Sequence, residues 1–163
     1  MKQLPIVWRR LVKDGETCAR CGSTGRALEA AVAKLAALLR PLDIEPVLER
    51  QEIAEETFKA NPLESNRVWI AGKPIEEWLN ANVGASPCCS VCGDVECRTL
   101  EVGGRIYETI PEEQFIAAGL MAASQMLMLG LSQDISATAC CGGASDVLVC
   151  APTPEGVIVC SCN

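Results

Sequence analysis

Cysteine is the residue whose number and spacing can support chemistry in this chain. The 163 residues include eleven cysteines and no histidine. Sulfur must therefore supply any nucleophile or soft metal ligand, and mechanisms that need a cysteine–histidine pair are excluded. The cysteines form three groups, which are Cys18 and Cys21; Cys88, Cys89, Cys92 and Cys97; and Cys140, Cys141, Cys150, Cys160 and Cys162. The pattern Cys-x-x-Cys-Gly occurs in the first group and again in the second, at 18–22 and 89–93.

The first pair suits reversible dithiol–disulfide exchange. A thiolate near a helix N-terminus is stabilised by the helix dipole and by backbone N–H groups, which makes it a competent nucleophile. We expect Cys18 to attack a disulfide, Cys21 to resolve the mixed disulfide, and Arg20 to add positive charge. The second group would relay electrons to a redox partner protein. This interpretation predicts a thiol–disulfide oxidoreductase that requires no cofactor.

The same spacing also fits a metal site, so whether the chain is an enzyme stays open. Two Cys-x-x-Cys-Gly knuckles can place four thiolates around one structural zinc ion, although the long stretch between Cys21 and Cys89 counts against a compact zinc ribbon. Adjacent cysteines seldom pair with each other and suit softer ions, such as arsenite, mercury or copper(I). The alternative function is therefore a non-catalytic thiolate module that carries zinc, a soft metal or a metalloid. Its candidate metal ligands are Cys88, Cys89, Cys92, Cys97, Cys140 and Cys141.

A third and simpler interpretation is an interaction domain whose cysteines are incidental. Free cysteine is among the most buried residue types, and we expect Cys150 and Cys160 to be small packing residues. They end the runs VLVC and VIVC, which flank a turn and predict a terminal hairpin.

Composition limits the class of protein and its partners. Hydrophobic residues make up 49% of the chain, enough to form a core without disulfides. The net charge of −7 argues against a nucleic-acid partner, because phosphate binding needs a basic face. The N-terminus lacks the pattern of a secretory leader, and the apolar stretch 116–131 is too short and too polar to span a membrane. We expect a cytoplasmic protein with reduced thiols, and the oligomeric state is left open.

Hydrophobic periodicity predicts the elements that position the cysteines. Alternation predicts a first strand over 3–12, and apolar residues at helical spacing predict a helix capped by Ser23 or Thr24 and ending near Arg40. A second strand over 44–50 contains Pro46, which favours a sheet edge. A third strand over 67–71 follows. A hairpin of 99–102 with 105–109 turns at Gly103 and Gly104, and a last helix opens at 111–113.

This order predicts an α/β fold with a thioredoxin-like βαβ half followed by a ββα half. Residues 1–131 would form the domain, with a Cys-rich insertion over 80–98, and residues 132–163 a Cys-rich extension. If 105–109 is the last strand, antiparallel to the third, the first two cysteine groups meet at one edge of the sheet. A ferredoxin-like α+β sandwich shares these elements and is the alternative fold.

Three segments carry a resemblance to a known family: ETCARCGST, ESNRVWIAGKPIEEWL and SPCCSVCGDVECRT, together with the helix start IPEE. Over roughly residues 3–120 the chain resembles an uncharacterised prokaryotic family, regarded as thioredoxin-like and rich in Cys-x-x-Cys-Gly motifs. No known reaction comes with that family. The resemblance implies a redox role for Cys18 and Cys21. Two features depart from thioredoxins: Ser65 and Asn66 stand where a cis-proline is expected, and Gly22 and Gly25 suggest that the helix starts only after the cysteines.

Overall fold

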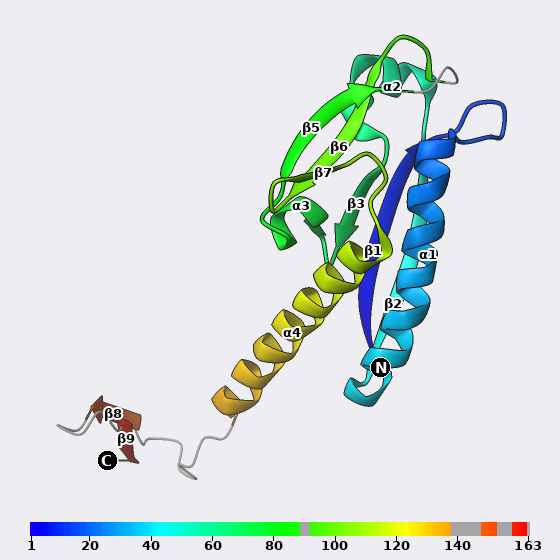
Figure 1. The fold of residues 1–163 in the computed structure, drawn as a ribbon. Coiled ribbons are helices and arrows are strands. Elements are labelled where there is room, and N and C mark those ends of the chain that lie inside the picture. The colour runs from blue at the N-terminus through cyan, green and yellow to red at the C-terminus, as the bar shows by residue number, and fades with distance from the viewer. Residues whose placement is uncertain (89–91, 138–147, 153–157, 163) are drawn as a thin grey trace. The chain divides into compact units, whose positions relative to one another are not determined.

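The computed structural model describes residues 1–88, 92–137, 148–152 and 158–162 of a mixed α/β chain. The chain divides into two compact units, Met1–Gln125 and Met126–Asn163. The first unit contains two sheets with their covering helices, and the second contains a small hairpin (Figure 1). Within the described residues, no helix is both long enough and apolar enough to cross a membrane.

The main sheet has the strand order β2-β1-β3-β4. Strand β1 (Lys2–Leu11) pairs in parallel with β2 (Ile44–Ile53) along its whole length and antiparallel with β3 (Arg67–Ile70). The edge position of β2, predicted from Pro46, is confirmed, and β1 lies inside the sheet. Because the parallel strands β1 and β2 are direct neighbours, the sheet does not fit the split βαβ unit of the ferredoxin-like alternative.

Helix α1 (Ala19–Leu39) connects β1 to β2 and runs alongside both strands (Figure 1). Its N-cap is Cys18, so the expectation that the helix starts only after the cysteines is wrong. The helix can begin there because the Cys18 sulfur accepts the Cys21 N–H at 3.5 Å and the Cys18 carbonyl accepts the Gly22 N–H at 2.8 Å. Gly22 and Gly25 therefore both lie inside the helix, and packing explains why residue 25 is a glycine.

Close packing between β1 and α1 accounts for Gly25. Leu4, Ile6 and Trp8 alternate onto the buried face of β1, as the sequence pattern predicts, and are 0–4% exposed. A Cβ atom on Gly25 would lie 2.3 Å from the Trp8 ring, a distance that real Cβ contacts do not reach. The missing side chain lets the tryptophan pack directly on the helix backbone.

In the first unit, the part of helix α4 (Glu112–Ala137) up to Gln125 packs against α1. Phe115 is fully buried, and a Cβ on Gly119 would lie 2.5 Å from Leu35 of α1. Lys34 of α1 also forms an ion pair with Glu112 at 2.6 Å. The predicted start of this helix, with acidic residues in its first turn, is confirmed.

The hairpin predicted to complete the main sheet belongs instead to a second sheet. Strands β5 (Asn82–Pro87), β6 (Glu96–Val102) and β7 (Arg105–Tyr107) form an antiparallel sheet in that order. The prediction that 105–109 pairs with the third strand is therefore wrong. Its place is taken by the short strand β4 (Lys73–Pro74), which pairs with β3 directly after a turn at Ala71 and Gly72, both with positive φ.

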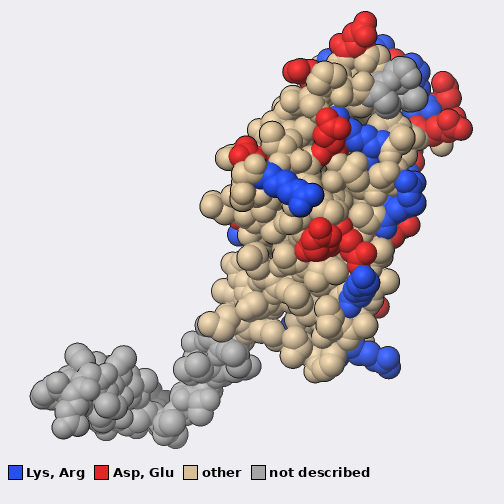
Figure 2. Space-filling view, in the orientation of Figure 1, with Lys and Arg blue, Asp and Glu red and all other residues tan. Residues whose placement is uncertain are grey.

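The remaining elements of the first unit are short. They are the 3-10 helices η1 (Arg40–Leu42) and η2 (Pro62–Glu64) and the α-helices α2 (Glu55–Ala60) and α3 (Ile75–Trp78). On the face shown in Figure 2, basic and acidic side chains are interspersed.

In the second unit, β8 (Leu148–Pro152) pairs antiparallel with β9 (Ile158–Cys162), so the predicted terminal hairpin is confirmed. In its register Cys150 stands opposite Cys160. Cys140 and Cys141, two of the predicted metal ligands, lie outside the described residues, as does Cys89 of the first unit.

Candidate functional site

Three cysteines from the first two groups converge in the first unit. The Sγ atoms of Cys18, Cys88 and Cys92 all lie within 4.8 Å of one another. Cys18 is 5% exposed, whereas Cys88 and Cys92 are half-buried. The first two groups therefore meet through these three residues, which we call the sulfur triad, but the connection that carries Cys88 and Cys92 belongs to the second sheet and not, as expected, to the main one.

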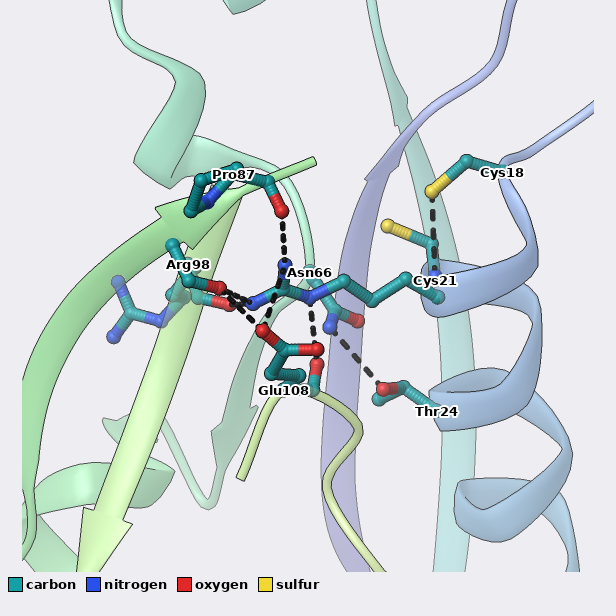
Figure 3. A network of polar contacts seen from close by, with 9 residues as sticks. Cys18, Cys21, Thr24, Asn66, Pro87, Arg98 and Glu108 are labelled. Carbon is teal, nitrogen blue, oxygen red and sulfur yellow. Dashed lines mark hydrogen bonds and ion pairs between the residues drawn. The ribbon is translucent and has the colours of Figure 1, made fainter. Parts of the chain in front are cut away.

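The triad depends on where α1 begins. Cys18 has extended backbone angles, φ −65° and ψ 158°, as the residue before a helix usually does. Its sulfur therefore turns back over the first turn, where it accepts the Cys21 N–H (Figure 3). Cysteine here occupies the position that serine, threonine or aspartate commonly fills, so the cap and the candidate ligand are one atom.

The other two members lie in the connection between β5 and β6. Pro87 and Glu96 are the last paired positions of these strands, so the cysteine loop leaves and re-enters the sheet at neighbouring points. The loop is closed at its base by a hydrogen bond from Cys88 N–H to the Val95 carbonyl, 3.0 Å. Cys88 and Cys92 are therefore held at the end of the β5–β6 ladder.

Arg20 joins the two segments that carry the triad. Its guanidinium donates to the carbonyls of Glu108 at 2.9 Å, Arg98 at 3.1 Å and Pro87 at 3.4 Å, and to the Ser86 hydroxyl at 2.9 Å (Figure 3). Its side chain is only 10% exposed. Because Pro87 immediately precedes Cys88, this contact ties the start of α1 to the start of the cysteine loop.

These contacts revise the role expected for Arg20. It was expected to place positive charge beside the cysteine pair. Its guanidinium instead contacts backbone carbonyl oxygens and, at 4.0 Å, the Glu108 carboxylate. A guanidinium is suited to such a bridge because its planar fork presents several donors in fixed directions. We therefore assign Arg20 to positioning the two cysteine segments.

Cys21 lies behind the triad and is 4% exposed. Its sulfur contacts the Ser65 hydroxyl at 3.6 Å, and the same hydroxyl accepts the Leu11 N–H at 3.0 Å. The next residue, Asn66, donates to Thr24 of α1 at 3.1 Å and accepts from the Trp8 indole at 3.3 Å. Ser65 and Asn66, placed just before β3, thus link β1, β3 and the first turns of α1.

Cys97 belongs to an apolar cluster beside the triad. It is 5% exposed and packs with Leu11, Ile53 and Phe58, and this cluster also contacts Cys88, Cys92 and Val95. The described cysteines of both groups are thiols rather than disulfides.

The crowding of sulfur makes several of these thiols hard to ionise. A hydrogen bond with Cys18, burial and the charge of Cys18 raise the pKa of Cys21 well above its ordinary range. Burial and then a hydrogen bond with Cys88 raise the pKa of Cys92 in the same direction. The same two causes raise the pKa of Cys97 to about 12. Neighbouring thiolates repel one another, so the site resists holding several negative charges without a cation.

The structure thus brings together part of the predicted set. Cys18, Cys88 and Cys92 meet; Cys21 and Cys97 lie next to them but face Ser65 and the apolar cluster. Sequence reasoning overlooked Ser65 and the bridging role of Arg20. The sequence did contain a clue to the position of Ser65. This residue comes shortly before β3, which is antiparallel to β1, so it lies near the end of β1, where α1 begins.

Comparisons with known proteins place the chain in a family. The family profile described as "Domain of unknown function (DUF2703)" matches residues 4–119, which include both cysteine groups of the first unit. An uncharacterized protein of Archaeoglobus fulgidus is 48% identical over 108 residues, which cover 66% of this chain and 79% of the relative. No solved structure matches the chain. The chain therefore belongs to the DUF2703 domain family.

Proposed function

We propose that the protein binds a thiophilic metal or metalloid ion through Cys18, Cys88 and Cys92. One observation carries the proposal: the three Sγ atoms lie within 4.8 Å of one another, although Cys18 is far in sequence from the loop that holds Cys88 and Cys92. A chain that uses its fold to collect three sulfurs at one point meets the main requirement of a soft-ion site.

The dimensions support this function. Thiolates bound at about 2.3 Å to one zinc-sized ion lie about 3.8 Å apart in tetrahedral geometry. The triad separations, all at or below 4.8 Å, are compatible with that spacing. A disulfide would need one pair to approach to about 2.05 Å. Contacts beyond the three sulfurs also hold the site in place. Arg20 links the start of α1 to Pro87, and the Cys88–Val95 hydrogen bond closes the cysteine loop.

The experiment is a titration of the reduced full-length chain with cadmium(II), followed by the sulfur-to-metal charge-transfer absorbance. We expect one ion per chain at the triad, and substitution of Cys18, Cys88 or Cys92 by serine should weaken its binding. Cys150→Ser, in the terminal hairpin, is the matched control and should leave this affinity unchanged. Unaltered affinity in Cys18→Ser would show that Cys18 is not a ligand and would refute the proposal.

A second candidate function, dithiol–disulfide exchange, is favoured by the position of Cys18 at the N-terminus of α1. Parallel β1 and β2 joined by α1, in a sheet of order β2-β1-β3-β4, support a thioredoxin-like arrangement with the Cys-x-x-Cys pair at the helix start. In this scheme the thiolate of half-buried Cys88 or Cys92 attacks the external disulfide, which forms a mixed disulfide and releases the first substrate thiolate. The thiolate of Cys18 then attacks the cysteine sulfur of that mixed disulfide, which forms an intramolecular disulfide and releases the second substrate thiolate. Each released thiolate takes up a proton.

Reduction of a small disulfide by the dithiol form, measured by release of its thiol, tests this second function. Two electrons leave the protein as one intramolecular disulfide forms, so one substrate disulfide should be consumed per reduced chain. Cys18→Ser should stop the reaction after a mixed disulfide. Full turnover in that variant, with an added dithiol as reductant, would exclude Cys18 from the exchange.

A further inference from the structure

We propose that the ion best matched to the sulfur triad is a trivalent, three-coordinate metalloid, of which arsenic(III) is the representative. This inference rests on the proposed ion-binding function and deepens it by naming the class of ion. Three features carry it: the number of converging sulfurs, the charge that the surroundings can neutralise, and a cavity that reaches Cys92.

Within the described part of the chain, the number of mutually close sulfurs matches a three-coordinate ion. Two further sulfurs touch the triad, since Cys21 hydrogen-bonds with Cys18, and Cys97 with Cys88 and Cys92. Among the described residues, however, only the triad sulfurs all lie within 4.8 Å of one another. Structural zinc usually takes four protein ligands in a closed tetrahedron. Arsenic(III) forms three bonds and keeps a lone pair, so three thiolates complete its coordination.

The net charge of the complex gives a second reason. Three thiolates with a divalent ion keep one negative charge, whereas three thiolates with a trivalent ion form a neutral centre. Burying an unpaired charge is costly; Cys18 is almost fully buried, and Cys88 and Cys92 pack against the apolar cluster. A neutral centre avoids that cost.

The nearby cations are already occupied by other partners. The Arg20 guanidinium is held by carbonyl oxygens and Glu108. Lys13 and Lys59 both form ion pairs with Glu55, at 3.7 and 2.9 Å. A residual negative charge on the centre would compete for these groups, so the surroundings favour the neutral, trivalent complex.

A cavity gives a small molecule access to the triad. A hollow of about 200 Å³ is lined by Cys92, Gly93, Leu11 and Phe58, with charged groups of α2 on its wall. This volume is several times the roughly 30 Å³ that one water molecule occupies in the liquid. Arsenous acid, an uncharged oxyacid of four heavy atoms at neutral pH, fits this space and would meet Cys92 first.

The reaction balances without any change of oxidation state. One As(OH)₃ reacts with three thiols: three As–O bonds break, three As–S bonds form, and each thiol proton leaves with a hydroxide as water. No oxidant or reductant is needed. The products are the neutral tris-thiolate centre and three water molecules.

The test uses the reduced full-length chain with sodium arsenite, and cadmium(II) as the divalent comparison. We expect one arsenic per chain, the loss of three titratable thiols, and an arsenic X-ray absorption spectrum with three sulfur neighbours and no oxygen. Cys92→Ser should weaken arsenite binding by more than about 100-fold, since even outer-sphere partners are commonly worth 10–100-fold. Cys150→Ser is the control and should bind as the parent chain does.

The outcomes separate this inference from the proposed function. If cadmium binds at the triad but arsenite does not, or if bound arsenic keeps an oxygen and consumes only two thiols, the inference is overturned and ion binding stands. If neither ion binds at the triad, both fall. Because the thiol count and the absorption spectrum are taken on the unmodified chain, the test does not depend on the folding of any variant.

Discussion

Replacing Arg20 with glutamine removes the bridge between the two cysteine segments while leaving every sulfur in the chain. The guanidinium donates to the carbonyls of Glu108, Arg98 and Pro87 and to the Ser86 hydroxyl, and its side chain is 10% exposed. Hydrogen bonds from charged donors are worth about 1.5–3 kcal/mol each, but water can replace part of this set at the rim. We therefore expect a loss of about 2–3 kcal/mol in the free energy of unfolding.

The effect on ion binding is the more specific readout. Outer-sphere residues that orient ligands commonly contribute 10–100-fold to metal affinity, and Arg20 fixes the position of Pro87 next to Cys88. We expect Arg20→Gln to weaken cadmium(II) binding by about tenfold or more, or about 1.4 kcal/mol. The assay is a competition titration against a chromophoric chelator, at a temperature where the variant is fully folded by circular dichroism.

The same helix offers a matched control. Arg26 is exposed, and among the described residues it donates to Ser23 at 2.9 Å, so Arg26→Gln should change both stability and affinity by less than about 0.5 kcal/mol. If folded Arg20→Gln binds cadmium as tightly as the parent chain, the bridge does not position the triad. Equal losses of affinity in the two variants would refute the reasoning as well, because they would indicate a general charge effect.

Three further predictions concern the scaffold. Gly25→Ala should lower the free energy of unfolding by about 1–3 kcal/mol, because its Cβ would lie 2.3 Å from the Trp8 ring, whereas Gly22→Ala, whose nearest contact is 3.6 Å, should be neutral or stabilising in urea denaturation. Ser65→Ala should cost about 1–3 kcal/mol by leaving a backbone N–H without its acceptor; an unchanged urea midpoint would contradict that role. Folding raises the pKa of Cys97 from 9.0 to about 12, so the unfolded chain loses this proton first and stability should fall as pH rises above about 9, by up to about 1.4 kcal/mol per pH unit from this thiol. Urea denaturation at several alkaline pH values should show a shallower fall in Cys97→Ala, and an equal slope would refute the assignment.

The parts of the fold that depend on local pattern were predictable from the sequence. Alternation in β1 and the helical spacing of α1 follow from burial on one face, and the edge position of β2 follows from the N–H that Pro46 lacks; these predictions are confirmed. The start of α1 was not predictable in this way, because a cysteine cap and two glycines resemble a loop. Gly25 is explained only by the ring of Trp8, a contact between residues distant in sequence.

The pairing of the later strands depended on very short segments. Strand β4 has two residues, Lys73 and Pro74, too few for alternation to mark a strand, yet it takes the place next to β3. The hairpin of β6 and β7 was recognised as a hairpin, but its assignment to a second sheet depends on β5, over 82–87, which contains glycine and proline and has no strong strand pattern.

The candidate site was predictable at the level of residue type and only partly in its membership. The prediction that the first two groups meet is confirmed for Cys18, Cys88 and Cys92. Which sulfurs converge could not be derived, because the Cys-x-x-Cys-Gly repeat drew attention to Cys21 as a ligand. Helix geometry instead turns Cys21 toward Ser65, and the start of the loop brings Cys88 to Cys18. The sequence shows that a positively charged residue, Arg20, stands between the paired cysteines. It does not show that the carbonyl groups bound by Arg20 come from residues distant in sequence.

Cadmium NMR on the reduced chain with one equivalent of cadmium(II) tests the convergence of the two groups most directly, because scalar coupling between the metal and cysteine β-protons identifies the ligands. The account predicts one bound-cadmium resonance that correlates with Cys18, Cys88 and Cys92 together. A resonance whose correlations stay within 88–97, without Cys18, would contradict it.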